Sequence, residues 1–146
     1  MNERGRRMAW YGVLLFLLSM VEGIAVQSLM NPRMALSAHV GGAMSGMFLL
    51  LLGLAWPALK LGSRTETITF WSAIGGFYVS SAGLVVAAAV GTQRSTPLNG
   101  FAGGASPFWE AIVNLLLSAG GGAVLLACLL VLWGLRRRHV TTGTGN

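Results

Sequence analysis

Residues 31–54 read NPRMALSAHVGGAMSGMFLLLLGL, and this stretch decides the fold. It opens with the turn residues Asn31 and Pro32, after which it predicts a helix from about residue 34 to residue 58. The run is apolar over the length of about 20 residues that a helix needs to cross a bilayer. Its one histidine, His39, is costly at membrane depth unless the ring has a partner. We therefore interpret His39 as a ligand or proton carrier at the head of a membrane span.

The composition of the whole chain supports a membrane location. Of the 146 residues, 54% are hydrophobic and only 10% are charged, whereas about a quarter are charged in an average soluble protein. The mean hydropathy is +0.68. The length leaves room for one domain, residues 1–146. The single cysteine, Cys128, lies in an apolar run, excludes an internal disulfide and is interpreted as a small core residue.

Four apolar runs predict an all-α fold, an integral membrane four-helix bundle. The helices are expected at about 8–30, 34–58, 67–90 and 108–135. A short polar loop is expected between the second and third helices, and a long glycine-rich connection over residues 91–107 between the third and fourth. The last residues, 139–146, are expected to form a disordered tail.

The basic residues are distributed unevenly between the two ends of these spans. Four spans place both termini and the connection between the second and third helices on one side. The opposite loops carry only Arg33 and Arg94. The positive-inside rule then predicts that both termini are cytoplasmic and that the chain is a multi-pass protein of the cell inner membrane. This topology explains the net charge of +6, and we expect no nucleic-acid partner because the sequence shows no basic face. The other basic residues of the chain all belong to the side that holds the two termini and the connection between the second and third helices: Arg4, Arg6, Arg7, Lys60, Arg64, Arg136, Arg137 and Arg138.

Polar side chains within the predicted spans concentrate in the half that lies beneath the 91–107 connection. Intramembrane polar residues are rare and commonly mark functional sites, so each of them is a candidate site residue. The inner half is almost wholly apolar, as in residues 48–52 and 125–131. The candidates are Glu22, His39, Ser45, Tyr78 and Glu110.

Most of these candidates also have a purely structural interpretation. His39 can bond a backbone carbonyl or cap the start of its helix. Glu22 can be protonated or paired with an outer arginine such as Arg33. Glu110 begins a helix, where the macrodipole favours an acid whatever its function. The hydroxyl of Tyr78 can simply bond a carbonyl within a packed core.

Two glycines beside the histidine bear on what the site can hold. The spacing Gly42-x-x-x-Gly46 allows a helix to approach a partner backbone closely, and beside a ligating histidine it would also admit a flat macrocycle. One intramembrane histidine cannot supply both axial ligands of a haem, but it can hold a five-coordinate haem with an open face. Zinc-ligand spacing, a phosphate-binding loop, a dinucleotide fingerprint and a nucleophile elbow are all missing from the sequence.

Several motifs resemble a known family. Residues 31–39 followed by Gly46-Met47-Phe48 resemble the second helix of the (hydroxyamino)benzene mutases. The start of the fourth helix, Trp109-Glu110-x-x-Val113, and its end, residues 128–136, are similar to the same family. These mutases are small membrane proteins that move the hydroxyl of a phenylhydroxylamine from nitrogen to the ring, which gives a 2-aminophenol.

A related resemblance is to styrene oxide isomerase, a four-helix membrane enzyme. The shared strings are Ala38-His39-Val40-Gly41, Gly46-Met47 and Gly76-Phe77-Tyr78. In that enzyme a trimer holds haem b at its subunit interfaces, a histidine is the axial ligand, and ferric iron acts as a Lewis acid on the epoxide oxygen. The chain departs from both groups at Ser45, where they have asparagine, and from the mutases at Gly41, where they have glutamate.

The resemblance implies a role for each candidate residue. His39 is expected to be the axial metal ligand of ferric haem b, with Gly42 and Gly46 beside the cofactor. The chain is expected to form a homotrimer in the lipid bilayer, with the haem at the subunit interface and a small aromatic substrate on its open face. The resemblance also implies that Tyr78 and Ser45 orient the substrate and that Glu22 or Glu110 moves a proton.

Four functions remain open at this point. The first is an isomerase that converts phenylhydroxylamine to 2-aminophenol, and the second is an isomerase that rearranges an aryl epoxide to an aldehyde. The third is a non-enzymatic tetraspan protein, such as a channel or assembly factor, which predicts no bound chromophore. The fourth is an electron-transfer subunit, which predicts a low-spin haem with a second ligand from a partner chain.

Overall fold

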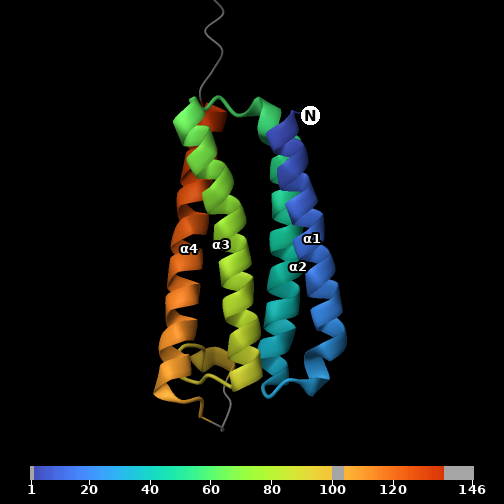
Figure 1. Ribbon diagram of the computed structural model, residues 1–146, viewed down its shortest axis with the longest axis vertical. Helices are drawn as coiled ribbons and strands as arrows, with labels where there is room; N and C mark the ends of the chain where they lie inside the picture. Colours follow the sequence, from blue (N-terminus) through green and yellow to red (C-terminus); the bar gives the residue numbers. More distant parts are fainter. Residues whose placement is uncertain (1, 100–103, 137–146) are drawn as a thin grey trace, which may run out of the picture.

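The chain folds into four long antiparallel helices (Figure 1). The computed structural model describes residues 2–99 and 104–136, so the expected disordered tail at 139–146 lies outside the described residues. The part of the chain that is described contains helices and turns and no strand. Each of the four helices is long and apolar enough to cross a membrane, which confirms the predicted all-α fold of four spans. They are α1 (Glu3–Ala25), α2 (Pro32–Ala55), α3 (Ser63–Val90) and α4 (Pro107–Arg136).

Helix boundaries follow local capping signals. The side chain of Asn2 accepts a hydrogen bond from Gly5 N, so α1 begins within the basic head rather than at residue 8. The side chain of Asn31 caps α2 in the same way and Pro32 takes its first position. Helix α3 ends at Gly91, whose φ of 68° is the left-handed conformation that glycine adopts most easily.

Single turns of 3-10 helix fill three of the connections. They are η1 (Val26–Ser28), η2 (Trp56–Ala58) and η3 (Pro97–Asn99). The predicted first helix, 8–30, is therefore shorter at its end, because α1 stops at Ala25 and η1 follows. Helix α3 starts at Ser63, so Arg64 and Glu66 belong to its first turns and not to a loop.

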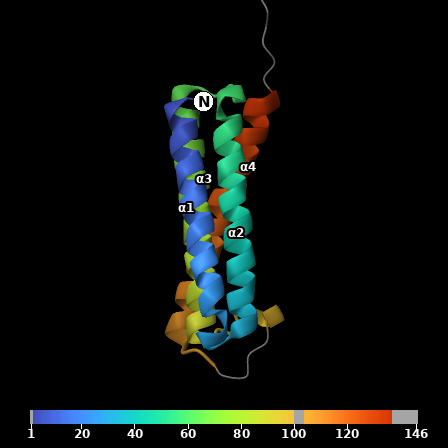
Figure 2. The same ribbon diagram turned by 90° about the vertical axis from the view of Figure 1, so that its right-hand side faces the viewer.

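Both ends of the described chain lie at the same end of the bundle. Figure 1 shows the start of α1 and the end of α4 at the top, beside the connection between α2 and α3. The α1–α2 turn and the α3–α4 connection lie at the opposite end, and the view turned by 90° shows the same arrangement (Figure 2).

Helices α1 and α2 pack closely along a row of small residues. Gly5, Gly12 and Ser19 are buried and follow each other at intervals of seven, facing Gly46 and Gly53 of α2. A Cβ on Gly12 would lie 2.7 Å from Gly46 O, and one on Gly53 would lie 2.6 Å from Gly5 O. Only glycine allows the two backbones to come this close.

Helices α3 and α4 form the second close pair. A Cβ on Gly76 of α3 would lie 3.0 Å from Gly120 O of α4. The buried residues of α4 also recur at intervals of seven: Val113, Gly120, Ala127 and Gly134. The fold is thus two tight helical hairpins packed side by side.

A polar cluster joins the two hairpins at the end where α1 begins and α4 ends. Arg4 of α1 forms an ion pair with Glu66 of α3, with 3.2 Å between Nη1 and Oε2. The buried indole of Trp56 donates a hydrogen bond of 2.9 Å to the other oxygen of Glu66. Because the carboxylate has two partners from two other elements, it fixes how the hairpins meet.

Candidate functional site

His39 is held against α1 by two hydrogen bonds that run in opposite directions. Its Nδ1 lies 2.7 Å from the main-chain oxygen of Ser19, while the Ser19 hydroxyl donates to the main-chain oxygen of His39 over 2.5 Å. A carbonyl oxygen can only accept, so Nδ1 carries the proton. In the neutral ring, the lone pair is then on Nε2. This is the state in which a histidine binds a metal while its other nitrogen is fixed by a carbonyl.

Gly23 makes room for the imidazole ring. A Cβ at this position would lie 2.7 Å from both Nδ1 and Cε1 of His39. The ring therefore lies directly over the α1 backbone, one turn beyond Ser19. Any side chain at Gly23 would push the ring away from the Ser19 carbonyl.

Ser19 and Gly23 are site residues that were not predicted from the sequence. The signal that could have found Ser19 is its place in the row of small residues at intervals of seven, which marks the face of α1 turned towards α2. Gly23 lies four residues further along the same face.

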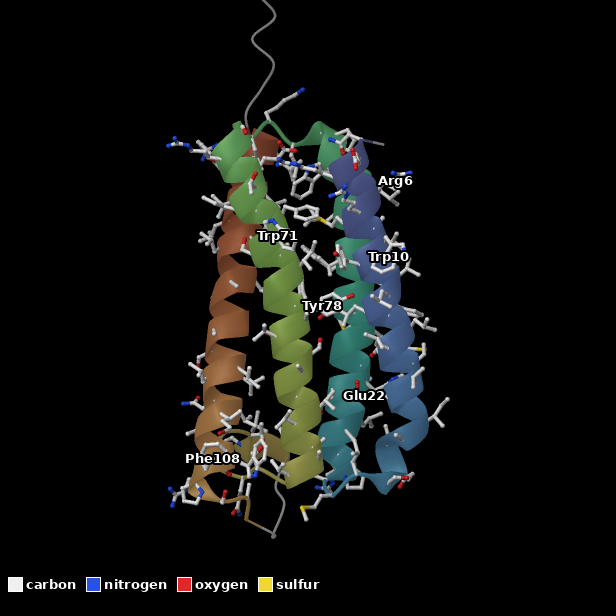
Figure 3. All side chains as sticks on the ribbon, viewed as in Figure 1. Arg6, Trp10, Glu22, Trp71, Tyr78 and Phe108 are labelled. Carbon is white, nitrogen blue, oxygen red and sulfur yellow. The ribbon has the colours of Figure 1, made fainter. Side chains whose placement is uncertain are left out.

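A groove of about 420 Å³ lies between α1 and α3, with Gly42 of α2 also in its wall. Its lining is almost entirely apolar, and the polar side chains in it are Ser19, Glu22, Tyr78 and Ser81. Figure 3 shows Tyr78 near mid-height of the bundle and Glu22 closer to the end that carries the α1–α2 turn. Two of the predicted catalytic residues, Tyr78 and Glu22, thus share one cavity.

The two residues differ in their hydrogen bonding. The Tyr78 hydroxyl donates a bond of 2.8 Å to the main-chain oxygen of Tyr11, which ties α3 to α1. Glu22 Oε1 is buried and has no hydrogen-bond partner among the described residues. The ion pairs of the described chain are Arg4–Glu66 and Arg7–Glu3, so the considered pairing of Glu22 with Arg33 is not present.

His39 does not line this groove. It stands seven, eight and eleven residues before Gly46, Met47 and Leu50, the α2 residues that line a smaller recess of about 170 Å³ on the α1–α2 pair. Residues at these spacings share one side of a helix. The His39 ring is therefore beside the recess and outside the lining of the groove, although Ser19, which bonds it, and Gly42, three residues further along α2, both line the groove.

Ser45 is also on a different face of α2 from His39. It lies six residues further on, which is about 120° around the helix axis. Its hydroxyl donates to Gly41 O over 2.7 Å, and a Cβ on Gly41 would face Leu84 of α3 at 3.5 Å. Ser45 is thus on the side of α2 that is turned towards α3.

The two predicted cofactor-binding glycines pack against α1. A Cβ on Gly42 would lie 2.7 Å from the Ser19 hydroxyl, and one on Gly46 would lie 2.6 Å from Phe16 N. Gly42 lines the large groove and Gly46 the smaller recess. Both therefore serve the close approach of α1 and α2 within one protomer.

Glu110 holds the connection between α3 and α4. Its Oε1 accepts hydrogen bonds from Gln93 N at 2.6 Å and Arg94 N at 3.1 Å. Its Oε2 accepts from Ser95 N at 2.9 Å and from the Ser95 hydroxyl at 2.8 Å. The geometry gives this carboxylate a structural role at the end of the bundle.

Comparison with known proteins assigns the chain to a family. Residues 4–136 match the family model for styrene oxide isomerase. The chain belongs to the styrene oxide isomerase family. It is 36% identical over 134 residues to hydroxylaminobenzene mutase HabB of Ectopseudomonas oleovorans, which covers 90% of this chain and 80% of HabB. It is 34% identical over 137 residues to hydroxylaminobenzene mutase HabA of the same organism, covering 86% of this chain and 94% of HabA.

Membership in the styrene oxide isomerase family, together with these relatives, makes the protein an isomerase. It carries no cluster of three or more His, Cys, Asp or Glu side chains among the described residues that could hold a bare metal ion. A metal held through one histidine needs its remaining donor atoms from another source, as a macrocycle supplies them.

Proposed function

We propose that the protein converts phenylhydroxylamine to 2-aminophenol within the membrane. The reaction is an isomerisation: the N–O bond breaks, a C–O bond forms at the ortho carbon, that carbon loses its proton and nitrogen gains one. The observation that carries the proposal is the His39 arrangement inside a chain similar to two hydroxylaminobenzene mutases. The apolar groove fits a lipid-soluble aromatic substrate and keeps competing water out.

His39 would hold the expected haem b through Nε2. The fit rests on the hydrogen bond from Nδ1 to the Ser19 carbonyl, which leaves Nε2 as the ligating atom and fixes the ring. When bound, the ferric haem would supply a Lewis acid towards the hydroxylamine oxygen. Tyr78 would orient the substrate in the groove, and Glu22, in the same lining, would accept the ring proton. Ser45 is outside this lining, and its hydroxyl bonds Gly41 O.

A homotrimer with the cofactor between subunits would bring these groups together. In one protomer, His39 is not among the residues that line the groove with Tyr78. A second copy that applies its groove to the His39 side would complete one site from two chains. That His39 stands outside the groove lining supports a site shared between copies, and the trimer is the assembly that the resemblance implies.

The orientation in the membrane follows from charge. Both ends of the described chain and the α2–α3 connection lie together at one end, where most of the basic residues are. We propose that this end faces the cytoplasm and that the protein resides in the cell inner membrane.

Rearrangement of an aryl epoxide to an aldehyde is the second candidate, because the matching family model is that of styrene oxide isomerase. An absorption spectrum of detergent-purified protein, followed by incubation with phenylhydroxylamine or styrene oxide, tests both. We expect a Soret band and formation of 2-aminophenol. His39→Ala should lose the band and the activity, while His139→Ala, at the other histidine of the chain, should keep both.

Three outcomes would contradict the proposal. Protein with no chromophore and no product would support a channel or assembly factor. A reversibly reducible, low-spin haem without turnover would support electron transfer. Unchanged haem content and activity in His39→Ala would remove the histidine from the site.

A further inference from the structure

We propose that Glu22 makes the α1–α3 groove selective for ligands that donate hydrogen bonds, so that the site takes an arylhydroxylamine in preference to an aryl epoxide. This inference rests on the proposed function, because it assigns the choice between the two candidate substrates to one side chain. It starts from the hydrogen-bonding state of each polar group in the groove.

The groove offers acceptors in preference to donors. The Ser19 hydroxyl gives its proton to His39 O, and the Tyr78 hydroxyl gives its proton to Tyr11 O. Each of these oxygens keeps lone pairs that can only accept. Ser81 is the remaining hydroxyl in the lining and can act either way.

Glu22 adds an acceptor that has no partner. Its Oε1 is buried and lacks a hydrogen bond in the described chain, although it lies in an otherwise apolar cavity. A buried polar atom without a partner is unfavourable, so a ligand that supplies a donor is stabilised there. The selectivity is that of the carboxylate, whose two oxygens only accept, and this is also the state in which Glu22 would take up the ring proton.

The two candidate substrates differ in this property. Phenylhydroxylamine carries one N–H and one O–H donor, and 2-aminophenol carries N–H and O–H donors as well. Styrene oxide has an oxygen that only accepts. A site built to bond a donor rejects an analogue that lacks it, because its own acceptor then stays unpaired. The aromatic ring, common to both, would lie against the shared apolar lining.

Two substitutions at Glu22 separate the contributions of its charge, its shape and its hydrogen bonding to substrate preference. In Glu22→Leu the acceptor is lost, and we expect KM for phenylhydroxylamine to rise about tenfold to hundredfold while that for styrene oxide changes less than about twofold. Loss of the proton acceptor alone would lower kcat for phenylhydroxylamine and leave its KM unchanged. Glu22→Gln keeps an acceptor oxygen and adds a donor, so it should lose less hydroxylamine activity and raise the epoxide-to-hydroxylamine ratio.

Ala25→Leu is the matched control for size. Ala25 lines the same groove one turn from Glu22, so a larger side chain there narrows the cavity without changing its acceptors. It should affect both substrates by a similar factor. Equal changes in KM for both substrates in Glu22→Leu would overturn the proposal, as would a substrate ratio in Glu22→Gln identical to that of the unchanged protein.

A binding measurement separates this inference from the proposed function. Calorimetric titration of the detergent-purified protein compares 2-aminophenol, a donor, with acetophenone, an acceptor of similar size. The unchanged protein should prefer 2-aminophenol, and Glu22→Leu should reduce that preference about tenfold or more. This preference without any turnover would contradict only the proposed function. Turnover of phenylhydroxylamine with no preference would contradict only the role of Glu22.

Discussion

The two helical hairpins are built on the same spacing of small residues but differ in their polar contacts. In the α1–α2 hairpin, Ser19 and His39 bond each other across the interface in both directions. In α3, the hydroxyls of Thr69 and Ser72 bond back to carbonyls of their own helix, at Thr65 and Ile68. The α1–α2 interface therefore carries a pair of hydrogen bonds between Ser19 and His39, whereas the hydroxyls of Thr69 and Ser72 stay within α3.

The difference shows that a hydrogen bond between membrane helices can position a side chain without adding much to the stability of the fold. Side-chain hydrogen bonds between membrane helices contribute only about 0.6 kcal/mol on average, so the Ser19–His39 pair adds little stability. Its effect is on geometry, because it fixes the rotation of α2 relative to α1 and the tautomer of the histidine. The α3–α4 hairpin forms the far wall of the groove and supplies Tyr78.

Disrupting the glycine contacts between α1 and α2 should have the largest effect on the stability of the fold. A side chain at Gly46 would meet the α1 backbone, since even a Cβ would lie 2.6 Å from Phe16 N. We expect Gly46→Leu to destabilise the protein by about 3 kcal/mol or more, because backbone cannot move aside as a side chain can. Unfolding in mixed detergent micelles measures this. Gly75→Leu is the matched control, as nothing lies within 4 Å of its Cβ position. Equal losses in both variants would contradict the packing role.

The four-helix fold could be predicted from sequence because hydropathy alone determines which segments span a bilayer. The starts of the helices were harder to predict from sequence. The cap at Asn2 extends α1 into the charged N-terminal segment, whose composition is that of a solvent-exposed end. The burial of Trp56 and its bond to Glu66 were not predicted, because both depend on how the two hairpins meet.

The site was only partly predictable for a related reason. A lone histidine and an acid in apolar runs could be found by inspection, and so could Tyr78. Their partners could not, because His39 and Tyr78 both bond main-chain oxygens, which every residue possesses. Which carbonyl is used depends on helix rotation, and sequence spacing gives that only to within part of a turn.

The turns at the ends of the hairpins give the next comparison. Asn31 N donates to Ala88 O, which ties the α1–α2 turn to α3, whereas the Glu110 carboxylate accepts hydrogen bonds from Gln93, Arg94 and Ser95 of the α3–α4 connection. Glu110→Gln removes one of two acceptor oxygens. We expect amide exchange at residues 93–95 to speed up about tenfold, since bonds to a charged group are worth about 1.5–3 kcal/mol and part of each is recovered by water.

Glu3→Gln is the control for the loss of charge, because Glu3 forms an exposed ion pair with Arg7 and such pairs contribute little. Exchange at 93–95 should be the same in this variant as in the unchanged protein. If Glu110→Gln abolished turnover while exchange stayed unaltered, Glu110 would return to the catalytic role that the sequence suggested.

The smallest expected effect on stability comes from removing one of the two hydrogen bonds between Ser19 and His39. Ser19→Ala removes the bond to His39 O but leaves the Ser19 carbonyl that accepts from the ring. We expect a stability loss of about 0.6 kcal/mol in the micelle assay. Ser72→Ala, whose hydroxyl bonds within α3, should lose less, because its helix keeps the same backbone bonds without it. A greater loss for Ser72→Ala would mean that the two hairpins do not differ in the way their hydroxyls suggest. If haem binds at His39, the Soret maximum should stay unchanged in Ser19→Ala, since the ring is oriented by the main chain and not by the hydroxyl.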